Sequence, residues 1–382
     1  MKILMVAIPN HHFFQWVDQL KNSGHEVFWF DITDGGPESK RIDWVKQIKG
    51  WKLKKDYPFR FRIKKRLPKL YTFIQKRNEY KVSEVFEELI NEIQPDIVHC
   101  FEMQLSGLPI LDIMKQNAIP FIYSSWGSDV FYFEKMGVTK QQAQDFYDRT
   151  DYLITDCKRD YNIILNNGYE SKFLGVFPGN GGLTVDINKI QPMVDRNTIL
   201  IKGYDDGIGK ASIVLKALEL VSEDLINDKK IIIYSADHSL KNIIKNSKLL
   251  STLKITIYSR YSFIQNTDLL ELMGKSCLHI ANSISDGMPN ALLEAMSMGA
   301  FPIQSNPGGV TEEVIINKKN GFLIENALDV NHIKELIEQA ILNDDLRKKA
   351  KDYNVKFIQK NYNRTILQSK ILKLYETVNT ID

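Results

Sequence analysis

The stretch SISDGMPNALLEAMSMGAFPI, residues 283–303, places two carboxylates, Asp286 and Glu294, eight positions apart. An apolar run ends where the stretch begins, and Gly287 and Pro289 separate that run from a segment rich in small and apolar residues. Proline is well placed at the start of a helix. The stretch therefore predicts a strand, a loop that holds Asp286, and a helix that holds Glu294.

The predicted helix begins at about Asn290, so the amides of Asn290 and Ala291 would have no partner inside the helix. The helix dipole favours an anion such as a phosphate at this end. Glu294 lies one turn further in, where its carboxylate would accept hydrogen bonds from ribose hydroxyls, and Asp286 would reach sugar hydroxyls beyond the phosphates. The alternative is an acidic N-cap followed by an ordinary helical glutamate.

The length and composition of the chain bound its class. A chain of 382 residues fits two domains better than one. Its 43% hydrophobic and 25% charged residues are typical of globular proteins, and no apolar run reaches the length of a membrane span. The start, MKILMVAIP, indicates a buried strand rather than a signal peptide, so we expect a cytoplasmic protein. Cys100, Cys157 and Cys277 lie far apart and predict reduced thiols rather than disulfides or a metal site.

Short runs rich in Ile and Val alternate with helical segments, which is the pattern of parallel α/β sheets. The predicted strands cover residues 2–8, 26–32, 96–101, 121–126, 152–157, 198–204, 230–236, 254–259, 278–283, 301–306 and 321–326. We expect two Rossmann-like, doubly wound domains that face a central cleft, over residues 1–188 and 189–360. A helix over residues 361–382 would cross back to the first domain. In such sheets, ligands bind beyond the carboxyl ends of the strands.

Positive charge is concentrated in residues 46–77, which hold thirteen Lys and Arg and a single acid, Asp56, in a chain of net charge +3. Aromatic residues interleave with the basic ones, so the stretch would lie on an anionic membrane with its rings in the headgroup layer. The alternatives are a solvated loop and a nucleic-acid-binding surface, but no recognised nucleic-acid module accompanies the patch. We expect peripheral contact with the inner face of the cytoplasmic membrane and no nucleic-acid partner.

The opening stretch and the residues after it, SNPGGVTEEVIINKKNGFLIE (305–325), resemble the nucleotide-sugar-binding signature of retaining GT-B glycosyltransferases, particularly glycosyltransferase family 4. That signature has a Glu, seven residues, a second Glu, a small-residue helix, a Gly-Gly turn, a Glu and an Asn-Gly turn. In this chain the matching positions are Asp286, which replaces the first Glu, then Glu294, Gly308, Gly309, Glu312, Asn320 and Gly321. The resemblance implies a GT-B fold and a nucleotide-sugar donor bound by Asp286, Gly287, Met288, Pro289, Asn290, Ala291 and Glu294.

A weaker resemblance covers TILIKGYDDGIGKASIVLKAL (198–218), the segment in which basic residues of the family meet the donor diphosphate. Lys202 and Lys210 are the candidates here, and Gly203 would also contact the donor. The usual Arg after this Gly is Tyr204, which leaves open which Lys holds the diphosphate. The segment is not a kinase or ATPase phosphate loop, because Tyr204 stands where such a loop has its first Gly.

In the first domain, SSWGSDVF (124–131) resembles the loop beneath the acceptor site of many relatives, which predicts acceptor contacts for Trp126, Ser128 and Asp129. Asp129 is also a catalytic candidate, and a helix N-cap is the alternative. His11 and His12 fill the first strand-to-helix loop and would meet the acceptor, or are simply exposed.

Two further positions are weaker candidates. His99 lies at the end of a predicted strand and would face the cleft. Gly181 belongs to FPGNGGLTVD (177–186), which resembles the loop that leaves the first domain, and its backbone would approach the donor. A flexible linker is the alternative for this loop.

The resemblance implies a retaining hexosyltransferase that moves a sugar from a nucleotide-sugar, a UDP-sugar in preference to a GDP-sugar, to a hydroxyl of a glycan or lipid-linked acceptor. Such an enzyme would serve cell-surface polysaccharide or glycoconjugate synthesis. We expect no metal, since lysine charge and helix amides would stabilise the leaving nucleoside diphosphate. The catalytic candidates are Asp286, Glu294, Lys210 and Asp129. A nucleotide-sugar epimerase of the same architecture, or a non-catalytic protein that binds a sugar nucleotide or a glycolipid, remains an alternative.

Overall fold

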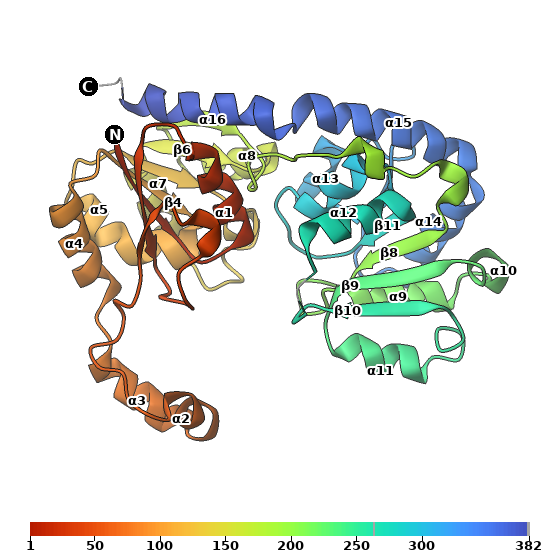
Figure 1. Ribbon diagram of the computed structural model, residues 1–382, viewed down its shortest axis with the longest axis horizontal. Helices are drawn as coiled ribbons and strands as arrows, with labels where there is room; N and C mark the ends of the chain where they lie inside the picture. Colours follow the sequence, from red (N-terminus) through yellow and green to blue (C-terminus); the bar gives the residue numbers. More distant parts are fainter. Residues whose placement is uncertain (263, 380–382) are drawn as a thin grey trace. The chain divides into compact units, whose positions relative to one another are not determined.

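The computed structural model describes residues 1–262 and 264–379, and these divide into two compact units. Unit 1 comprises Met1–Asp156, Asp160–Gly181 and the chain from Gln368 onward. Unit 2 comprises Cys157–Arg159 and Gly182–Leu367. Each unit has one parallel sheet with helices on both faces (Figure 1). The predicted α/β fold of two doubly wound sheets is therefore confirmed.

The sheet of unit 1 has the order β3-β2-β1-β4-β5-β6-β7, and all its neighbouring strands are parallel. Its strands are β1 (Lys2–Ala7), β2 (Glu26–Asp31), β3 (Lys46–Ile48), β4 (Ile97–Phe101), β5 (Phe121–Ser124), β6 (Tyr152–Thr155) and β7 (Lys172–Val176). The order reverses between β1 and β4, so the carboxyl ends of these two strands flank the place where such sheets bind ligands.

Helices cover both faces of this sheet because alternate strand residues are apolar on each side. The helices of this part of the chain are α1 (His11–Val17), α2 (Arg60–Arg66), α3 (Pro68–Asn78), α4 (Val82–Ile93), α5 (Leu111–Lys115), α6 (Ser128–Phe131), α7 (Lys140–Arg149), α8 (Lys158–Asn166) and α16 (Arg364–Asn379). Of these, α2 and α3 bury almost no side chain and do not cover the sheet. Leu4 and Val6 pack with α4, α5 and α7 on one face. On the other face, Trp16 of α1 meets Phe101 edge to face and donates a hydrogen bond to Tyr375 of α16.

The sheet of unit 2 has the order β10-β9-β8-β11-β12-β13 and is also parallel throughout. Its strands are β8 (Thr198–Lys202), β9 (Lys230–Ala236), β10 (Ile255–Ser259), β11 (Ser276–Ala281), β12 (Phe301–Ser305) and β13 (Phe322–Ile324). The order reverses between β8 and β11. The loops that follow these two central strands are therefore the expected ligand site of unit 2.

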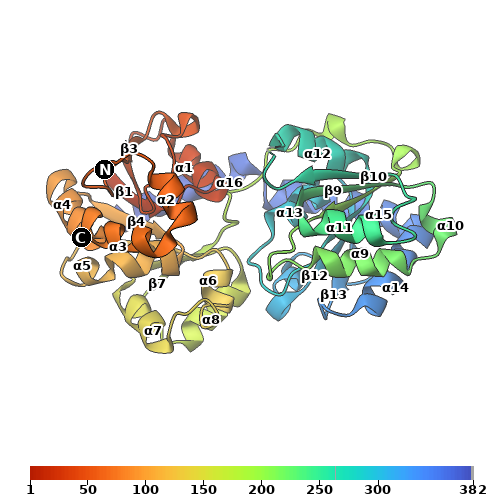
Figure 2. The ribbon, with the colours of Figure 1, turned by 90° about the horizontal axis from the view of Figure 1, so that it is seen from below.

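The helices of unit 2 lie on both faces of its sheet (Figure 2). They are α9 (Ala211–Glu219), α10 (Glu223–Ile226), α11 (Ser239–Asn246), α12 (Asn266–Lys275), α13 (Asn290–Ser297), α14 (Val330–Leu342) and α15 (Asp344–Asn361). Ile199 and Ile201 of β8 pack with α9, α11 and α14, whereas Leu200 between them packs with α12 and α13 on the opposite face. α13 and α12 thus lie on the same face of the sheet.

All eleven strands predicted from the sequence are present, and two more, β3 and β7, were not predicted. β3 has only three residues and lies in the basic stretch, and β7 contains Gly175, so neither has the apolar run that marks a buried strand. Within residues 1–262 and 264–379, none of the helices has both the length and the apolar character needed to span a membrane.

Candidate active site

The loops after β8 and β11 are joined to each other at the carboxyl edge of the unit 2 sheet. The amide of Lys210 donates to the carbonyl of Asn282 at 2.9 Å, and the amide of Ile284 donates to the carbonyl of Ile208 at 3.0 Å. Gly209 lies in this pairing, where a Cβ would come within 2.4 Å of a backbone oxygen. Only glycine fits there, so the glycine of the sequence sets the shape of the loop that carries Lys210.

The opening stretch folds as predicted. Asp286 lies in the loop between β11 and α13, and α13 begins at Asn290 with Pro289 as its N-cap residue. The amide of Gly287 hydrogen-bonds Asp286, and Met288 is buried in the core beside Leu292. The backbone from Asp286 to Ala291 therefore forms a fixed turn that leads into the helix.

Glu294 lies in α13 and is held by α12. Asn266, the first residue of α12, donates its side-chain amide to Oε1 of Glu294 at 2.9 Å. Burial raises the pKa of Glu294 to about 6, and the Asn266 hydrogen bond and the Lys202 charge oppose this rise. The protein thus orients one carboxylate oxygen of Glu294, and this carboxyl group ionises near neutral pH.

Asp286 lies among cations. Burial raises its pKa, whereas the charges of Lys202 and Arg159 lower it. The Arg159 guanidinium donates to the backbone oxygens of Asp286, at 2.8 Å, and of Pro307, at 2.7 Å. Glu313 accepts hydrogen bonds from the backbone amides of Lys158 and Arg159, both at 3.0 Å, which fixes this arginine against the Asp286 loop.

Lys202 is the cation that links the site, because its charge acts on Asp286, on Glu294 and on the buried His279. It is the last residue of β8. Its ammonium nitrogen lies 4.8 Å from the centroid of the Tyr204 ring. Lys210, by contrast, is the N-cap residue of α9, and the structure describes no ion pair for its ammonium group.

Tyr204 stands where relatives have an arginine, and the structure supplies a guanidinium from elsewhere. The Cζ atom of Arg260, which follows β10, lies 4.3 Å from the Tyr204 ring centroid. Arg260 is held by Asp237 and Asp206, at 3.0 and 3.1 Å. The Tyr204 ring therefore has both a lysine and an arginine within cation–π range.

Two buried polar residues lie beneath the site. The hydroxyl of Tyr234 in β9 and Nε2 of His279 in β11 are 2.9 Å apart. Burial, with a smaller contribution from Lys202, lowers the pKa of His279 to about 3, so its ring is neutral at physiological pH. Gly203, next to β8, packs so closely that a Cβ would lie 2.6 Å from the Cα of Ala236. These contacts fix the strand ends below Lys202.

The later positions of the signature are structural in character. Gly308 and Gly309 have φ angles of 62° and 82°, which glycine adopts without strain. Glu312 accepts a 2.8 Å hydrogen bond from Asn306. The amide of Asn320 donates to Asn354 of α15 at 2.8 Å. These contacts shape the loops of this half of the signature.

In unit 1, part of the predicted acceptor set comes together. The rings of His12 and Trp126 meet edge to face with centroids 6.3 Å apart. His11 lies beside Arg41, whose guanidinium nitrogen is 3.1 Å from Nδ1, and burial and this charge lower the pKa of His11. Asn10 caps α1 by accepting from the His12 amide. Asn10, His11 and His12 follow β1, and Trp126 follows β5, so these side chains lie at the carboxyl edge of the sheet.

Asp129 is buried and fully engaged. Its carboxylate accepts hydrogen bonds from the Tyr123 hydroxyl at 2.6 Å and from the amides of Met103 and Trp126, both at 2.9 Å. Burial raises its pKa, and these hydrogen bonds lower it. Ser128, the first residue of α6, is partly exposed beside it. Asp129 thus holds the Trp126 turn in place, and its role in catalysis stays a prediction.

The two weaker candidates are both buried in contacts of unit 1. Gly181 has φ 68°, its carbonyl accepts from Gln19 at 2.9 Å, and a Cβ would collide with that side chain. His99 is fully buried in β4, with Tyr375 and Ser124 each 2.8 Å from one of its ring nitrogens. These hydrogen bonds tie α16 to the sheet of unit 1. Donor contact by Gly181 and acceptor contact by His99 stay predictions.

Three residues that shape the unit 2 site, Asn266, Arg159 and Arg260, were not predicted from the sequence. Each is far in sequence from the residue that it contacts, and each occurs in a segment without a recognisable motif. The tyrosine at position 204 left open which Lys holds the diphosphate, and it did not point to Arg260.

Two known families match the chain, one over most of each unit. Residues 188–357 match the family described as Glycosyl transferases group 1, and this range contains all six strands of unit 2. Residues 2–157 match the family described as Glycosyl transferase 4-like, and this range contains β1 to β6. These matches and the fold support a GT-B glycosyltransferase. No curated protein sequence matches the chain.

Solved structures with the same fold match nearly the whole of this chain. Sucrose-phosphate synthase from Thermosynechococcus elongatus is similar with a TM-score of 0.71 and 14% identity, over 100% of both chains. A glycosyltransferase from Rickettsia africae gives 0.66 and 17%, over 100% of this chain and 99% of that one. HepE from Anabaena, in complex with UDP, gives 0.67 and 11%, over 99% and 100%. At these identities the likeness shows the fold.

Proposed function

We propose that the protein is a retaining, metal-independent glycosyltransferase that moves a sugar from a nucleotide-sugar, a UDP-sugar in preference to a GDP-sugar, to a hydroxyl of a glycan or lipid-linked acceptor. The observation that carries this proposal is the grouping of Glu294, Asp286 and Lys202 at the switch point of the unit 2 sheet. Two carboxylates and one shared cation, partly buried at a sheet edge that favours ligands, suit a donor that has both hydroxyls and phosphates.

Each group has a separate task in this proposal. Glu294, oriented by Asn266, accepts hydrogen bonds from the ribose hydroxyls. Asp286 accepts from hydroxyls of the transferred sugar. The first amides of α13 face the diphosphate, at the positive end of the helix dipole.

Lysine charge stabilises the leaving nucleoside diphosphate as the bond to the sugar breaks. The charge of Lys202 acts on both carboxylates, and Lys210 is the N-cap residue of α9. Arg260 adds a third cation beside Tyr204. The acceptor hydroxyl attacks the anomeric carbon on the face from which the diphosphate leaves, and its proton passes to the departing diphosphate oxygen. The configuration is therefore retained, and no pair of side-chain acid and base is needed.

Two kinds of support favour UDP and a sugar-like acceptor. HepE was solved with UDP and with UDP-glucose, and TarM from S. aureus was solved with UDP and alpha-GlcNAc-glycerol. In unit 1, the ring of Trp126 with His12 beside it offers an apolar face and a polar edge, the combination that packs against sugars. We place the acceptor at this carboxyl edge of the unit 1 sheet. We propose that the reaction serves the synthesis of cell-surface polysaccharide or glycoconjugate.

Isothermal titration of the purified protein with UDP, GDP and ADP, with and without EDTA, tests the donor site. We expect UDP to bind most tightly, EDTA to have no effect, and Glu294→Ala to lower the affinity at least about tenfold, as loss of a charged hydrogen-bond acceptor predicts. Glu335→Ala, an exposed position on α14, is the matched control and should bind as the wild type does.

Product analysis with the preferred UDP-sugar then tests the reaction. A glycosylated acceptor with retained configuration supports the proposal. A changed sugar nucleotide in the absence of acceptor would identify an epimerase, and tight UDP binding without any product would identify a binding protein. Equal affinity of wild type and Glu294→Ala for UDP would contradict the proposed contact between Glu294 and the ribose hydroxyls.

A further inference from the structure

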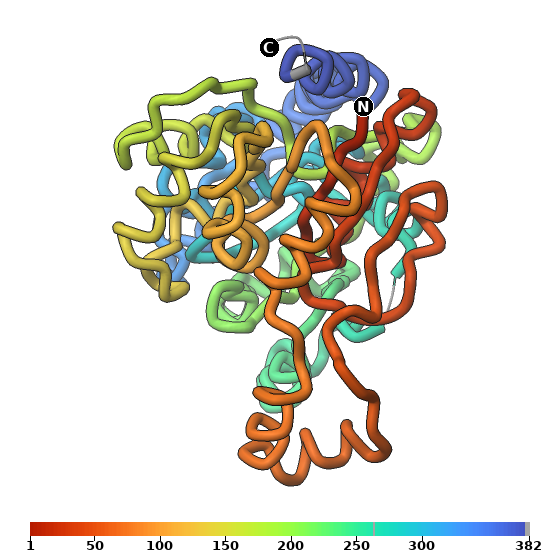
Figure 3. Tube along the Cα trace, turned by 90° about the vertical axis from the view of Figure 1, so that its left-hand side faces the viewer, coloured from red at the N-terminus to blue at the C-terminus, as the bar shows by residue number. Residues whose placement is uncertain are grey.

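The basic stretch of unit 1 folds into two short helices rather than a loop. α2 ends at Arg66, Leu67 links the helices, α3 begins at Pro68, and the two helices contact each other. We call residues 59–78 the basic hairpin. It contains eight Lys and Arg and no acid, and it extends away from the sheet of unit 1 (Figure 3).

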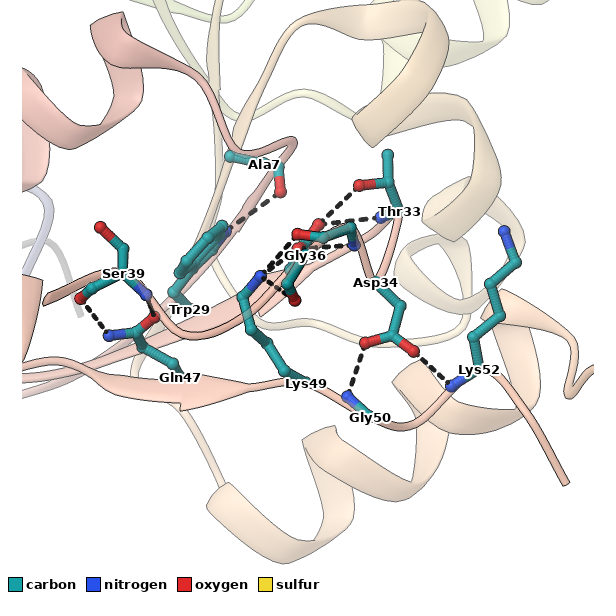
Figure 4. Close-up of polar contacts among 12 residues, drawn as sticks. Ala7, Trp29, Thr33, Asp34, Gly36, Ser39, Gln47, Lys49, Gly50 and Lys52 are labelled. Carbon is teal, nitrogen blue, oxygen red and sulfur yellow. Dashed lines mark hydrogen bonds and ion pairs between the residues drawn. The ribbon is translucent and has the colours of Figure 1, made fainter. Parts of the chain in front are cut away.

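The base of the basic hairpin is fixed to the sheet. The buried ammonium of Lys49 forms an ion pair with the buried carboxylate of Asp31 at 2.8 Å, and Asp34 accepts a hydrogen bond from the amide of Lys52 at 3.1 Å (Figure 4). Where the chain returns, the amide of Tyr80 donates to the carbonyl of Lys52 at 2.9 Å. The hairpin is therefore a structured projection with a bonded base.

Apolar side chains of the basic hairpin are left in water. Phe61, Phe59 and Phe73 are 76%, 66% and 56% exposed, and they are the exposed phenylalanines of the part of the chain that the structure describes. Leu67 and Leu70 are exposed as well. Single exposed apolar residues are common, but five within twenty residues form the kind of surface that a partner covers.

Cations stand beside these rings. The guanidinium carbons of Arg77 and Arg62 lie 4.2 and 5.3 Å from the ring centroids of Phe73 and Phe59. Arg60 forms a 3.7 Å ion pair with Asp56. For the other seven basic residues of the hairpin, the structure describes no ion pair with any residue in 1–262 or 264–379. The hairpin thus presents uncompensated positive charge and aromatic rings on the same short helices.

We propose that the basic hairpin is a docking element for an anionic membrane surface. Its Lys and Arg side chains would contact the lipid phosphates, and its Phe and Leu side chains would enter the boundary between headgroups and acyl chains. A nucleic acid would satisfy the charge but would leave Leu67 and Leu70 in water, so the apolar residues decide between the two partners. The proposal is independent of the donor site, because the hairpin belongs to unit 1 and the carboxylates belong to unit 2.

Sedimentation of the full chain with lipid vesicles tests this proposal. The vesicles are phosphatidylcholine alone, or phosphatidylcholine with about one third phosphatidylglycerol. The charge variant carries Arg62→Gln, Lys64→Gln, Lys65→Gln and Arg66→Gln. Its matched control neutralises four exposed lysines of α15, by Lys348→Gln, Lys349→Gln, Lys356→Gln and Lys360→Gln. The apolar variant carries Phe61→Ala and Phe73→Ala.

We expect the wild type to bind only the anionic vesicles, and more weakly as salt is added. Because each basic residue near an anionic surface contributes about fivefold to binding, the charge variant should lose at least about tenfold in partition, and the control should lose less than about twofold. The apolar variant should lose several-fold. Titration of each variant with UDP checks, independently of vesicle binding, that the variant is folded and that its donor site is intact.

Two results would overturn the proposal. One is equal vesicle binding by the wild type and the charge variant, or no binding of the wild type to anionic vesicles. The other is full vesicle binding by the apolar variant together with equally tight, charge-dependent binding of double-stranded DNA, which would show a general polyanion surface instead of a membrane-docking one.

Discussion

The side-chain amide of Asn266 lies 2.9 Å from Oε1 of Glu294 and joins the start of α12 to the second turn of α13. Both helices pack on the same face of the unit 2 sheet. The hydrogen bond fixes one carboxylate oxygen and also lowers the pKa of Glu294 against the effect of burial. Asn266 is therefore a positioning residue in the proposed donor site.

Asn266→Ala should weaken UDP binding about tenfold, because a charge-assisted hydrogen bond that orients the ligand group contributes roughly 1.5 kcal/mol. The pH at which half of the UDP affinity is lost should also rise, since the pKa of Glu294 loses a lowering influence. Calorimetric titration between pH 5 and pH 8 measures both effects. Thr267→Ala, the exposed neighbour, is the control, and a variant with unchanged pH dependence would argue against this role.

The raised pKa of Glu294 predicts how donor binding depends on pH. A carboxylate accepts hydrogen bonds from ribose hydroxyls, and protonation removes one of its acceptor sites. With a pKa of about 6, UDP affinity should be constant above pH 7 and should fall as the pH decreases through 6. Titration of Glu294→Gln should show weaker binding without this inflection. An inflection near pH 6 that persists in Glu294→Gln would assign it to another group.

The same pKa predicts a stability cost. An acid whose pKa is higher in the folded than in the unfolded state destabilises the fold above its folded pKa, and this effect vanishes below its unfolded pKa. For Glu294 the penalty should be present above about pH 6 and absent below about pH 4.5. Glu294→Gln should therefore raise the melting temperature at pH 7.5, because it raises the free energy of unfolding by up to about 2 kcal/mol. This gain should shrink toward pH 4.5. Thermal melts across this range measure it, and a gain that is independent of pH would contradict the assignment.

The pH dependence of UDP affinity should distinguish the roles of the two candidate lysines, Lys202 and Lys210. Lys202→Gln removes a charge that lowers the pKa of both Asp286 and Glu294, so UDP affinity should fall about tenfold or more and the inflection should move above pH 6. Lys210→Gln should weaken UDP but not uridine, since its contribution is to the diphosphate, and should leave the inflection in place. Lys216→Gln, on the exposed side of α9, is the control. Equal shifts for both lysines would mean that Lys210 also acts on the carboxylates.

The sequence predicted those parts of the structure that depend on local pattern. Ile- and Val-rich runs determined the strands, and Pro289 determined the start of α13 at Asn290. The partners of the carboxylates were not predictable, because the contacts of Asn266 and Arg159 depend on how distant segments pack. No local rule places an asparagine at the start of one helix against a glutamate 28 positions later.

The basic stretch shows a different limit. Its charge and aromatic content were evident, but α2 buries no residue and α3 buries only Gln75, so the periodic pattern that marks an amphipathic helix is weak there. The buried pair of Asp31 and Lys49 at its base was equally hidden, since isolated acids and lysines in a charged segment normally indicate solvated positions.

The last prediction concerns α16 and unit 1. Tyr375 accepts a hydrogen bond from the indole nitrogen of Trp16 at 3.0 Å, and its hydroxyl lies 2.8 Å from Nδ1 of the buried His99. Removal of the hydroxyl leaves the indole nitrogen of Trp16 and Nδ1 of His99 without this partner. Each buried polar group that stays unsatisfied costs about 1–3 kcal/mol of folding free energy. Because burial lowers the pKa of His99 to about 3, the loss should not depend on pH between 5 and 8.

Tyr375→Phe should therefore lower the melting temperature of unit 1 by several degrees at every pH in that range, with UDP affinity unchanged because the donor carboxylates lie in unit 2. Tyr353→Phe, an exposed tyrosine of α15, is the matched control. Hydrogen exchange adds a local readout, since amides in α16 after Gln368 should exchange faster if the hydroxyl holds the helix on the sheet. Unchanged exchange with unchanged melting would show that apolar packing of the Tyr375 ring is sufficient to hold α16.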